Sequence, residues 1–219
     1  MRQKTLGLVH TSPPLVPVFQ ELCETKLPDV GTFNIVDDSL IKEVIRKGGL
    51  TPSIARRAVH HIVSAEEAGA DTILVTCSSI GRAVETATGM VEVPVLRVDQ
   101  PMADRAVQTA GKIGVVATLP TTLEPTADLI YRRAKKAARE VELVTRLCPG
   151  AFQALMRGNA ARHDAIVVEH LKKLASEVEI IVLAQASMAR VVERLPEADR
   201  RIPILASPPL AIDYLATTL

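Results

Sequence analysis

Short apolar runs alternate with longer stretches of helical periodicity along the whole chain. Apolar runs of this kind are typical of strands that are buried on both faces of a parallel sheet. Their regular alternation with helical segments predicts a parallel α/β architecture, with four strands in each half of the chain. The predicted strands are residues 5–9, 31–35, 72–76, 93–96, 112–117, 140–145, 180–183 and 202–205.

The segments between these strands place apolar residues three and four positions apart, which is the spacing of one helix face. Helices in these positions supply the crossover connections that a parallel sheet needs. The predicted helices are residues 15–24, 40–47, 52–68, 81–86, 101–109, 122–138, 151–158, 161–176, 189–194 and 209–216.

The two halves of the chain resemble each other in sequence. Residues 70–85 read ADTILVTCSSIGRAVE and residues 178–193 read VEIIVLAQASMARVVE, at an offset of 108 positions without a gap. Residues 7–13 and 114–120 match at an offset of 107, and residues 93–96 and 202–205 match at an offset of 109. Three matches in the same order indicate a duplicated unit of about 100 residues, which is the size of a small domain.

We therefore predict an α/β protein made of two pseudo-symmetric four-stranded parallel-sheet halves, with the active site in the cleft between them. The first half comprises residues 1–98 and 205–219, because we expect the last helix to pack back on it. The second half comprises residues 99–204.

The duplicated segments differ in chemistry at one position, where Cys77 is matched by Gln185. Both residues lie at an elbow between a predicted strand and a predicted helix, and ligands of parallel sheets bind beyond the carboxyl ends of the strands. Hydroxyl groups and free backbone N–H groups at such elbows suit a carboxylate. Besides Cys77, the predicted substrate-binding residues are Thr11, Ser12, Thr76, Ser78, Ser79, Thr118, Gln185 and Ser187.

Cys77 is the candidate catalytic residue. A free thiol has a pKa near 8.5, so ionising it at pH 7 costs about 2 kcal/mol, and a helix N-terminus offsets up to about 1 kcal/mol of this cost. A thiolate in this position can act as a base or a nucleophile. The alternative is that Cys77 is a small apolar residue that fills space at a strand end. We interpret Cys23 and Cys148 as structural or surface thiols.

Composition excludes several functional classes. The 219 residues carry a formal net charge of +1, 2% aromatic residues and no Trp, which argues against nucleic-acid or anionic membrane surfaces as partners. We expect no membrane span and no signal peptide. Three scattered cysteines form neither a disulfide framework nor a metal motif, so we expect a cytoplasmic protein without a metal site.

The motifs LVTCSS at residues 74–79, IVLAQ at 181–185 and PILASP at 203–208 resemble the aspartate/glutamate/hydantoin racemase superfamily, which includes maleate isomerase and arylmalonate decarboxylase. The resemblance covers the whole chain. It implies a cofactor-independent enzyme, frequently a homodimer or higher homo-oligomer, that acts on a small carboxylate or hydantoin-like substrate. In the racemases one thiolate removes a proton beside a carboxylate, and a second thiol protonates the opposite face. Cys77 occupies the place of the first thiol and Gln185 that of the second.

Gln185 cannot exchange a proton at neutral pH, so symmetric two-thiol racemisation is not available to this chain. We expect an isomerase in which Cys77 transfers the proton, Gln185 binds the carboxylate or developing enediolate, and a water or His10 supplies the second proton. A substrate ammonium would have a counter-charge only if Asp99 supplied it, which favours a carboxylate or a ring carbonyl compound. Two alternatives stay open: a single-thiol decarboxylase of a malonate-type substrate, and a carboxylate-binding protein without catalysis.

Overall fold

A computed structural model describes residues 3–196 and 200–219 of the chain, which divides into two compact units. The first unit comprises Met1–Gln100 with Pro208–Leu219, and the second comprises Pro101–Ser207. The strands of the first unit are β1 (Thr5–His10), β2 (Gly31–Val36), β3 (Thr72–Val75) and β4 (Val95–Arg97). Those of the second are β5 (Lys112–Ala117), β6 (Glu142–Leu147), β7 (Ile180–Leu183) and β8 (Ile204–Ala206).

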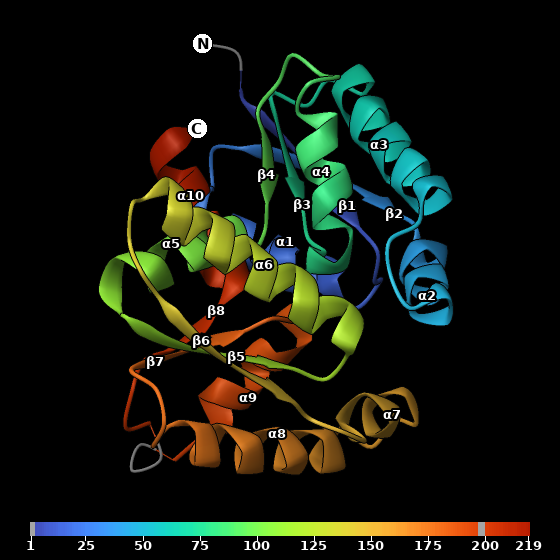
Figure 1. The fold of residues 1–219 in the computed structure, drawn as a ribbon. Helices are drawn as coiled ribbons and strands as arrows, with labels where there is room; N and C mark the ends of the chain where they lie inside the picture. Colours follow the sequence, from blue (N-terminus) through green and yellow to red (C-terminus); the bar gives the residue numbers. More distant parts are fainter. Residues whose placement is uncertain (1–2, 197–199) are drawn as a thin grey trace. The chain divides into compact units, whose positions relative to one another are not determined.

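Both units use the same strand order. The first sheet is ordered β2-β1-β3-β4 and the second β6-β5-β7-β8, and every pairing is parallel (Figure 1). The predicted fold class, two four-stranded parallel α/β halves, is confirmed. Two boundaries differ by a few residues. The first unit ends at Gln100 rather than at residue 98. Leu205 and Ala206, which the sequence analysis assigns to the first half, pair with β7 in the second sheet because β8 continues through them.

The helices fall where the periodicity places them, and each described end lies within two residues of its predicted position. A 3-10 turn follows β3 and another follows β7, and neither was predicted separately. The 3-10 turns are η1 (Ser78–Ile80) and η2 (Ala186–Met188). The helices are α1 (Leu15–Lys26), α2 (Asp38–Lys47), α3 (Pro52–Glu67), α4 (Gly81–Ala87), α5 (Gln100–Thr109), α6 (Pro120–Lys136), α7 (Ala151–Met156), α8 (Ala160–Leu174), α9 (Ala189–Arg194) and α10 (Ser207–Thr218).

Local side-chain caps explain where two helices of the first unit begin. The Asp37 carboxylate accepts from the backbone N–H of Ser39 at 3.1 Å and caps α2, which therefore starts two residues before the predicted position. Thr51 caps α3 by accepting from the Ile54 N–H, with Pro52 in the first turn. These caps place α2 and α3 beside the carboxyl ends of β2 and β1.

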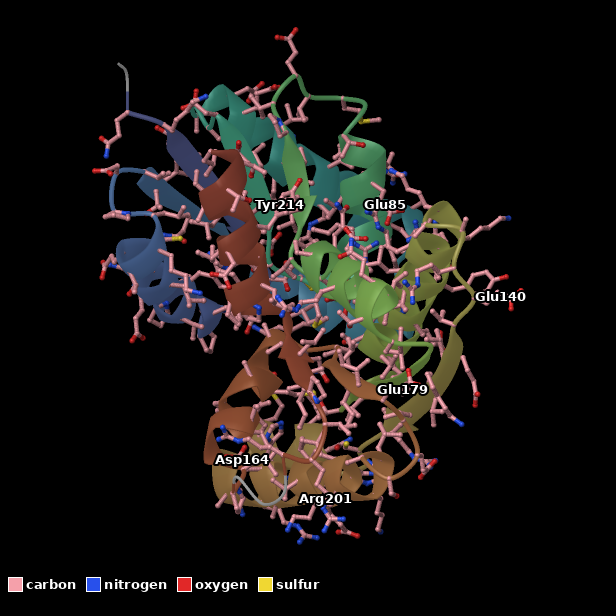
Figure 2. The ribbon with its side chains drawn as sticks, turned by 90° about the vertical axis from the view of Figure 1, so that its left-hand side faces the viewer. Glu85, Glu140, Asp164, Glu179, Arg201 and Tyr214 are labelled. Atoms are coloured by element: carbon pink, nitrogen blue, oxygen red, sulfur yellow. The ribbon has the colours of Figure 1, made fainter. Side chains whose placement is uncertain are left out.

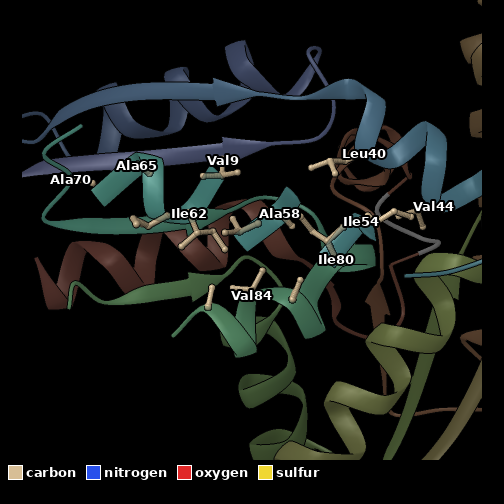
Figure 3. Close-up of a cluster of buried hydrophobic side chains, with 14 residues drawn as sticks. Val9, Leu40, Val44, Ile54, Ala58, Ile62, Ala65, Ala70, Ile80 and Val84 are labelled. Carbon is tan, nitrogen blue, oxygen red and sulfur yellow. The ribbon is translucent and has the colours of Figure 1, made fainter. Parts of the chain in front are cut away.

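Helices cover both faces of the first sheet, because side chains along each buried strand point alternately to opposite faces. Val9, Ile73 and Val75 point toward a core completed by α2, α3 and α4, which Figure 3 shows in close-up. The intervening positions, such as Leu8 and Leu74, contribute to a second cluster with residues of α1 and α10. The last helix thus packs on the first sheet.

Matching glycines in the two sheets let a helix lie close to the central strand. A Cβ on Gly7 of β1 would lie 3.0 Å from the Cβ of Ala70 and 3.4 Å from that of Ala65 on α3. A Cβ on Gly114 of β5 would lie 2.7 Å from Cδ2 of Leu174 on α8. The duplicated glycine therefore has the same packing role in both units.

The second unit buries a comparable core against one face of its sheet. Ile181 and Leu183 of β7 pack with Val167 and Leu171 of α8 and with Val191 of α9. Within the described residues, no helix combines the length and apolar character that crossing a membrane requires.

Candidate active site

Cys77 lies at the elbow between β3 and α4. One residue, Thr76, separates the strand from Cys77, whose backbone is extended (φ −131°, ψ 113°) before η1 turns the chain into α4. Cys77 is half-buried, whereas Ser78 and Ser79 are buried. The elbow therefore presents a thiol at the carboxyl edge of the first sheet, where the sequence analysis places it.

The surroundings of the Cys77 sulfur act on its ionisation in opposite directions. Burial is the largest influence and raises the pKa of the thiol, and the negative charge of Asp99 raises it further. The hydroxyl of Thr11 and the backbone N–H groups of Ser79 and Ile80 hydrogen-bond the sulfur and lower the pKa. These three donors come from β1's carboxyl end and from the elbow itself. They favour negative charge on the sulfur, as a base or nucleophile requires, although burial keeps the pKa of the thiol raised overall.

Thr76 and His10 form a buried pair beside the thiol. The Thr76 hydroxyl lies 2.9 Å from Nδ1 of His10, and Nε2 of His10 lies 2.9 Å from Oδ1 of Asn34. Because the Asn34 oxygen only accepts, Nε2 carries the proton and Nδ1 accepts from Thr76. The carbonyl oxygen of Val9 receives the backbone N–H of Thr76 at 3.0 Å and also lies 3.3 Å from the Thr76 hydroxyl, so the contact of this hydroxyl with the ring is the shorter of its two.

This arrangement corrects the role considered for His10. Burial lowers the pKa of His10, opposed by its hydrogen bond with Asn34, so the ring is neutral. The side chain has no exposed surface, and both ring nitrogens have partners. His10 therefore orients Thr76 rather than supplying a proton to a substrate. Asn34, which the sequence analysis missed, lies at an exposed position of β2, the strand that pairs with β1.

A buried ion-pair cluster joins β4 to α4. Nε and Nη2 of Arg97 donate to Oδ1 and Oδ2 of Asp99 at 3.0 and 2.8 Å, and Nη1 donates to Glu85 on α4. Figure 2 labels Glu85. Arg97 is 3% exposed and Asp99 0%. Both oxygens of Asp99 are therefore bound by a guanidinium, which argues against Asp99 as the counter-charge of a substrate ammonium. The sequence analysis did not single out Arg97. A cation at the end of a buried strand could have indicated a buried ion pair.

The second unit repeats the elbow with an amide in place of the thiol. Gln185 follows β7 and precedes η2, and its Oε1 accepts from the backbone N–H of Thr118 at 2.6 Å and from the Thr118 hydroxyl at 2.8 Å. A backbone N–H can only donate, so the acceptor is the amide oxygen and the –NH₂ group points away from Thr118. The half-buried Gln185 side chain thus presents two N–H donors.

The remaining predicted residues lie after β1 and in the two elbows. Ser12 is half-buried at the end of β1, and its carbonyl accepts from the Leu15 N–H at 3.1 Å. Ser78 lies in η1 and its carbonyl accepts from the Gly81 N–H, whereas Ser187 is half-buried in η2. The structure therefore brings Thr11 and Ser79 to the Cys77 sulfur and brings Thr118 to Gln185, while the Thr76 hydroxyl is directed to His10.

Cys23 and Cys148 are structural thiols, as interpreted from the sequence. They are 2% and 0% exposed, and burial raises the pKa of Cys23 to about 11 and that of Cys148 to about 12. Thiols in such surroundings are protonated and unreactive near neutral pH. Among residues 3–196 and 200–219, no three or more His, Cys, Asp or Glu side chains gather as metal ligands.

Two surface hollows in the described structure contain neither elbow. One, of about 450 Å³, is lined by Arg146, His170, Lys173, Ser176 and Glu177 of the second unit. The other, of about 320 Å³, is lined by Asp37, Ser53, Arg56, Arg57, His60 and His61 of the first unit. Both are lined mainly by charged groups in open contact with solvent, so the chemistry of the elbows decides the candidate site.

Two repeated parallel sheets, each with a polar elbow at the same strand end, define a duplicated α/β protein. Residues 9–215 match the model of a protein family described as Asp/Glu/Hydantoin racemase. The chain belongs to this family, which confirms the resemblance read from the sequence and supports an isomerase or racemase type of function.

Solved structures of racemases share the fold at low sequence identity. Glutamate racemase isoform RacE1 from Bacillus anthracis has a TM-score of 0.78 at 18% identity, covering 100% of this chain and 82% of that one. Aspartate racemase from Picrophilus torridus has a TM-score of 0.72 at 14% identity, with coverage of 98% and 94%. Allantoin racemase from Klebsiella pneumoniae has a TM-score of 0.65 at 16% identity, with coverage of 99% and 87%. No curated protein matches the chain at a significant level.

Proposed function

We propose that the protein is a cofactor-independent isomerase, racemase- or epimerase-like, in which Cys77 transfers a proton at the carbon next to a carboxylate or ring carbonyl. The observation that carries the proposal is the set of donors around the sulfur. Burial raises the pKa of the Cys77 thiol, and the Thr11 hydroxyl and two backbone N–H groups of η1 act against this by favouring the thiolate, which is the form that removes a proton. A cysteine that only filled space would not need three donors.

Gln185 is proposed to bind the substrate rather than to exchange protons. Thr118 fixes the amide oxygen through two hydrogen bonds, at 2.6 and 2.8 Å, and so fixes the direction of the –NH₂ group. A preorganised N–H donor stabilises the negative charge that develops on a carboxylate or carbonyl oxygen when the neighbouring carbon loses its proton. The second proton then comes from a water, because His10 is buried and fully hydrogen-bonded.

The substrate class follows from the charges at the first elbow. Asp99 is the acidic group whose charge acts on the Cys77 thiol, and both of its oxygens are bound by Arg97. A substrate ammonium placed beside Cys77 would therefore gain no counter-charge from this carboxylate. We propose a carboxylate without an α-amino group, or a ring carbonyl compound such as a 5-substituted hydantoin, as the substrate.

A second candidate is a single-thiol decarboxylase of a malonate-type substrate. It is favoured by one observation, namely that the elbow matching Cys77 carries an amide. After carbon dioxide leaves, the carbanion needs only one proton, so one thiol is sufficient. A carboxylate-binding protein without catalysis is the remaining alternative.

Proton NMR in heavy water tests these functions. The protein is incubated with 5-substituted hydantoins, maleate, arylmalonates, aspartate and glutamate, in parallel with Cys77→Ala. Deuterium incorporation or isomerisation that requires Cys77 supports the isomerase. Loss of a carboxyl group that requires Cys77 supports the decarboxylase instead. Turnover that survives Cys77→Ala contradicts both. Cys23→Ala is the matched control, because it removes a buried thiol far from either elbow in sequence and should leave turnover intact.

A further inference from the structure

The Arg97 side chain touches the part of the chain that carries Cys77. A Cβ built on Gly81, the first residue of α4, would lie 2.2 Å from Cζ and 2.3 Å from Nη2 of Arg97. The guanidinium therefore lies against the backbone of the elbow helix, at a contact that only glycine permits. Gly81 closes the turn that begins with Ser78 and Ser79, directly after Cys77.

The same guanidinium controls a charge near the thiol. It binds both oxygens of Asp99 and one of Glu85, and it is almost completely removed from solvent. Buried charge pairs interact strongly because little water screens them, and removal of one partner leaves an uncompensated buried charge. If Arg97 were absent, the full negative charge of Asp99 would act on Cys77.

We infer that Arg97 is a positioning residue for Cys77: it neutralises Asp99 and holds Gly81, so that the elbow can stabilise a thiolate. This inference rests on the proposed role of Cys77. The charged groups that it involves are Asp99 after β4, Arg97 on β4, Glu85 on α4, and Arg82 on α4, which pairs with Glu85 at 3.6 Å. His10 at the end of β1 is neutral and bonded to Asn34 and Thr76. Thr11 and the N–H groups of η1 are the uncharged donors to the sulfur.

The two partners of the ion pair should affect the thiol in opposite directions. Loss of the Asp99 charge removes repulsion from the thiolate and leaves the Arg97 cation, so the Cys77 pKa falls. Loss of the Arg97 charge leaves Asp99 uncompensated, so the Cys77 pKa rises. A purely structural role predicts instead that both substitutions loosen the elbow and change the thiol in the same direction.

The test is the rate of alkylation of Cys77 by iodoacetamide as a function of pH, read by mass spectrometry without any substrate. The thiolate attacks the iodoacetamide carbon, a C–S bond forms and iodide leaves. Cys23 and Cys148 are 2% and 0% exposed, whereas Cys77 is half-buried, so modification near neutral pH reports Cys77, with Cys77→Ala as the blank. The variants are Arg97→Gln, Asp99→Asn and the double substitution.

Arg97→Gln should slow alkylation at pH 7.5 about tenfold, and Asp99→Asn should accelerate it about tenfold. The double variant should return to within about twofold of the wild-type rate, because the charges are removed together. Arg46→Gln, which breaks an exposed ion pair with Glu43 on α2, is the matched control and should leave the rate unchanged.

Shifts of the same sign in both single variants, or no shift beyond that of Arg46→Gln, would overturn the inference. If Arg97→Gln does not fold, Asp99→Asn and the double variant decide. Faster alkylation of Cys77 in Asp99→Asn, with a return to the wild-type rate in the double variant, supports the inference. An alkylation rate in Asp99→Asn that is unchanged or lower contradicts it. Failure of the proposed function is distinguishable, because it would appear as turnover by Cys77→Ala and would leave the alkylation rates unaffected.

Discussion

Thr118 gives its backbone N–H and its hydroxyl to a single atom, Oε1 of Gln185, at 2.6 and 2.8 Å. The first unit has the same relationship in another chemical form, because the Thr11 hydroxyl hydrogen-bonds the Cys77 sulfur. Thr11 and Thr118 match at the offset of 107 found in the sequence. Both units therefore have a threonine at the matching position that hydrogen-bonds the elbow side chain, which is a thiol in the first unit and an amide in the second.

Gln185→Glu should reduce turnover strongly while the fold is retained. The carboxylate keeps an oxygen for Thr118 but replaces the –NH₂ donors with a second oxygen, which repels an anionic substrate. Loss of one such donor to a developing oxyanion lowers kcat by about a hundredfold or more. Steady-state kinetics check this expectation. Gln153→Glu, the same change at an exposed position of α7, is the control, and an equal loss in both variants would argue against a specific role of the Gln185 amide.

Gln185→Cys should add a second thiol at the duplicated position. In the proposed isomerase a water supplies the second proton because residue 185 is an amide. With a thiol at this position, the variant should exchange the substrate proton for deuterium starting from either enantiomer. The measurement is proton NMR in heavy water on each enantiomer separately. Gln185→Ser serves as the comparison, because serine is similar in size to cysteine but its hydroxyl is much less acidic than a thiol. Exchange that stays as one-sided as in the wild type would contradict the expectation.

The buried neutral His10 should make stability depend on pH in the acidic range. Burial lowers its pKa in the folded protein below the unfolded value near 6.5, so the folded state binds the proton less tightly. The stabilisation is complete above pH 6.5 and is lost as the pH falls, by about 1.4 kcal/mol for each tenfold difference in proton affinity. Urea unfolding between pH 7.5 and 4.5 measures this.

His10→Gln should remove this part of the pH dependence, although it also lowers stability at every pH. His60→Gln, at an exposed position of α3, is the control and should keep the wild-type slope. A slope that survives His10→Gln would mean that other groups cause the acidic loss of stability.

Gly81→Ala should destabilise the first unit. The added methyl would lie 2.2 Å from Cζ of Arg97, and the guanidinium is held by Asp99 and Glu85, so it has little freedom to move away. Overpacking of a buried contact typically costs about 1–3 kcal/mol. Gly49→Ala is the matched control, since a Cβ there meets no atom within 4 Å. Thermal unfolding of both variants checks the difference, and equal midpoints would refute the contact.

The amino-acid sequence by itself determined the secondary structure, the strand-helix alternation and the duplication. These features depend on local periodicity, and β5, β7 and α9 have the predicted bounds. The larger boundary differences have local causes: Asp37 starts α2 early, and Ala138, with a left-handed φ of 51°, lies in the turn between α6 and the late start of β6. The placement of Cys77 and Gln185 at matching elbows also follows from sequence, because an elbow is defined by the strand that ends there.

Only the tertiary structure decided what those elbow residues touch. His10 ends a strand among hydroxyl groups, and nothing in its sequence neighbours shows that Asn34 and Thr76 bind both ring nitrogens. The sequence does not show that Asp99 has a partner, whereas in the structure Arg97 donates to both of its carboxylate oxygens. Thr118 and Gln185 are 67 residues apart in the chain and meet because β5 and β7 are neighbours in the sheet. Such partners come from different strands, so they depend on sheet order and on the direction in which packing turns each side chain, neither of which a local pattern encodes.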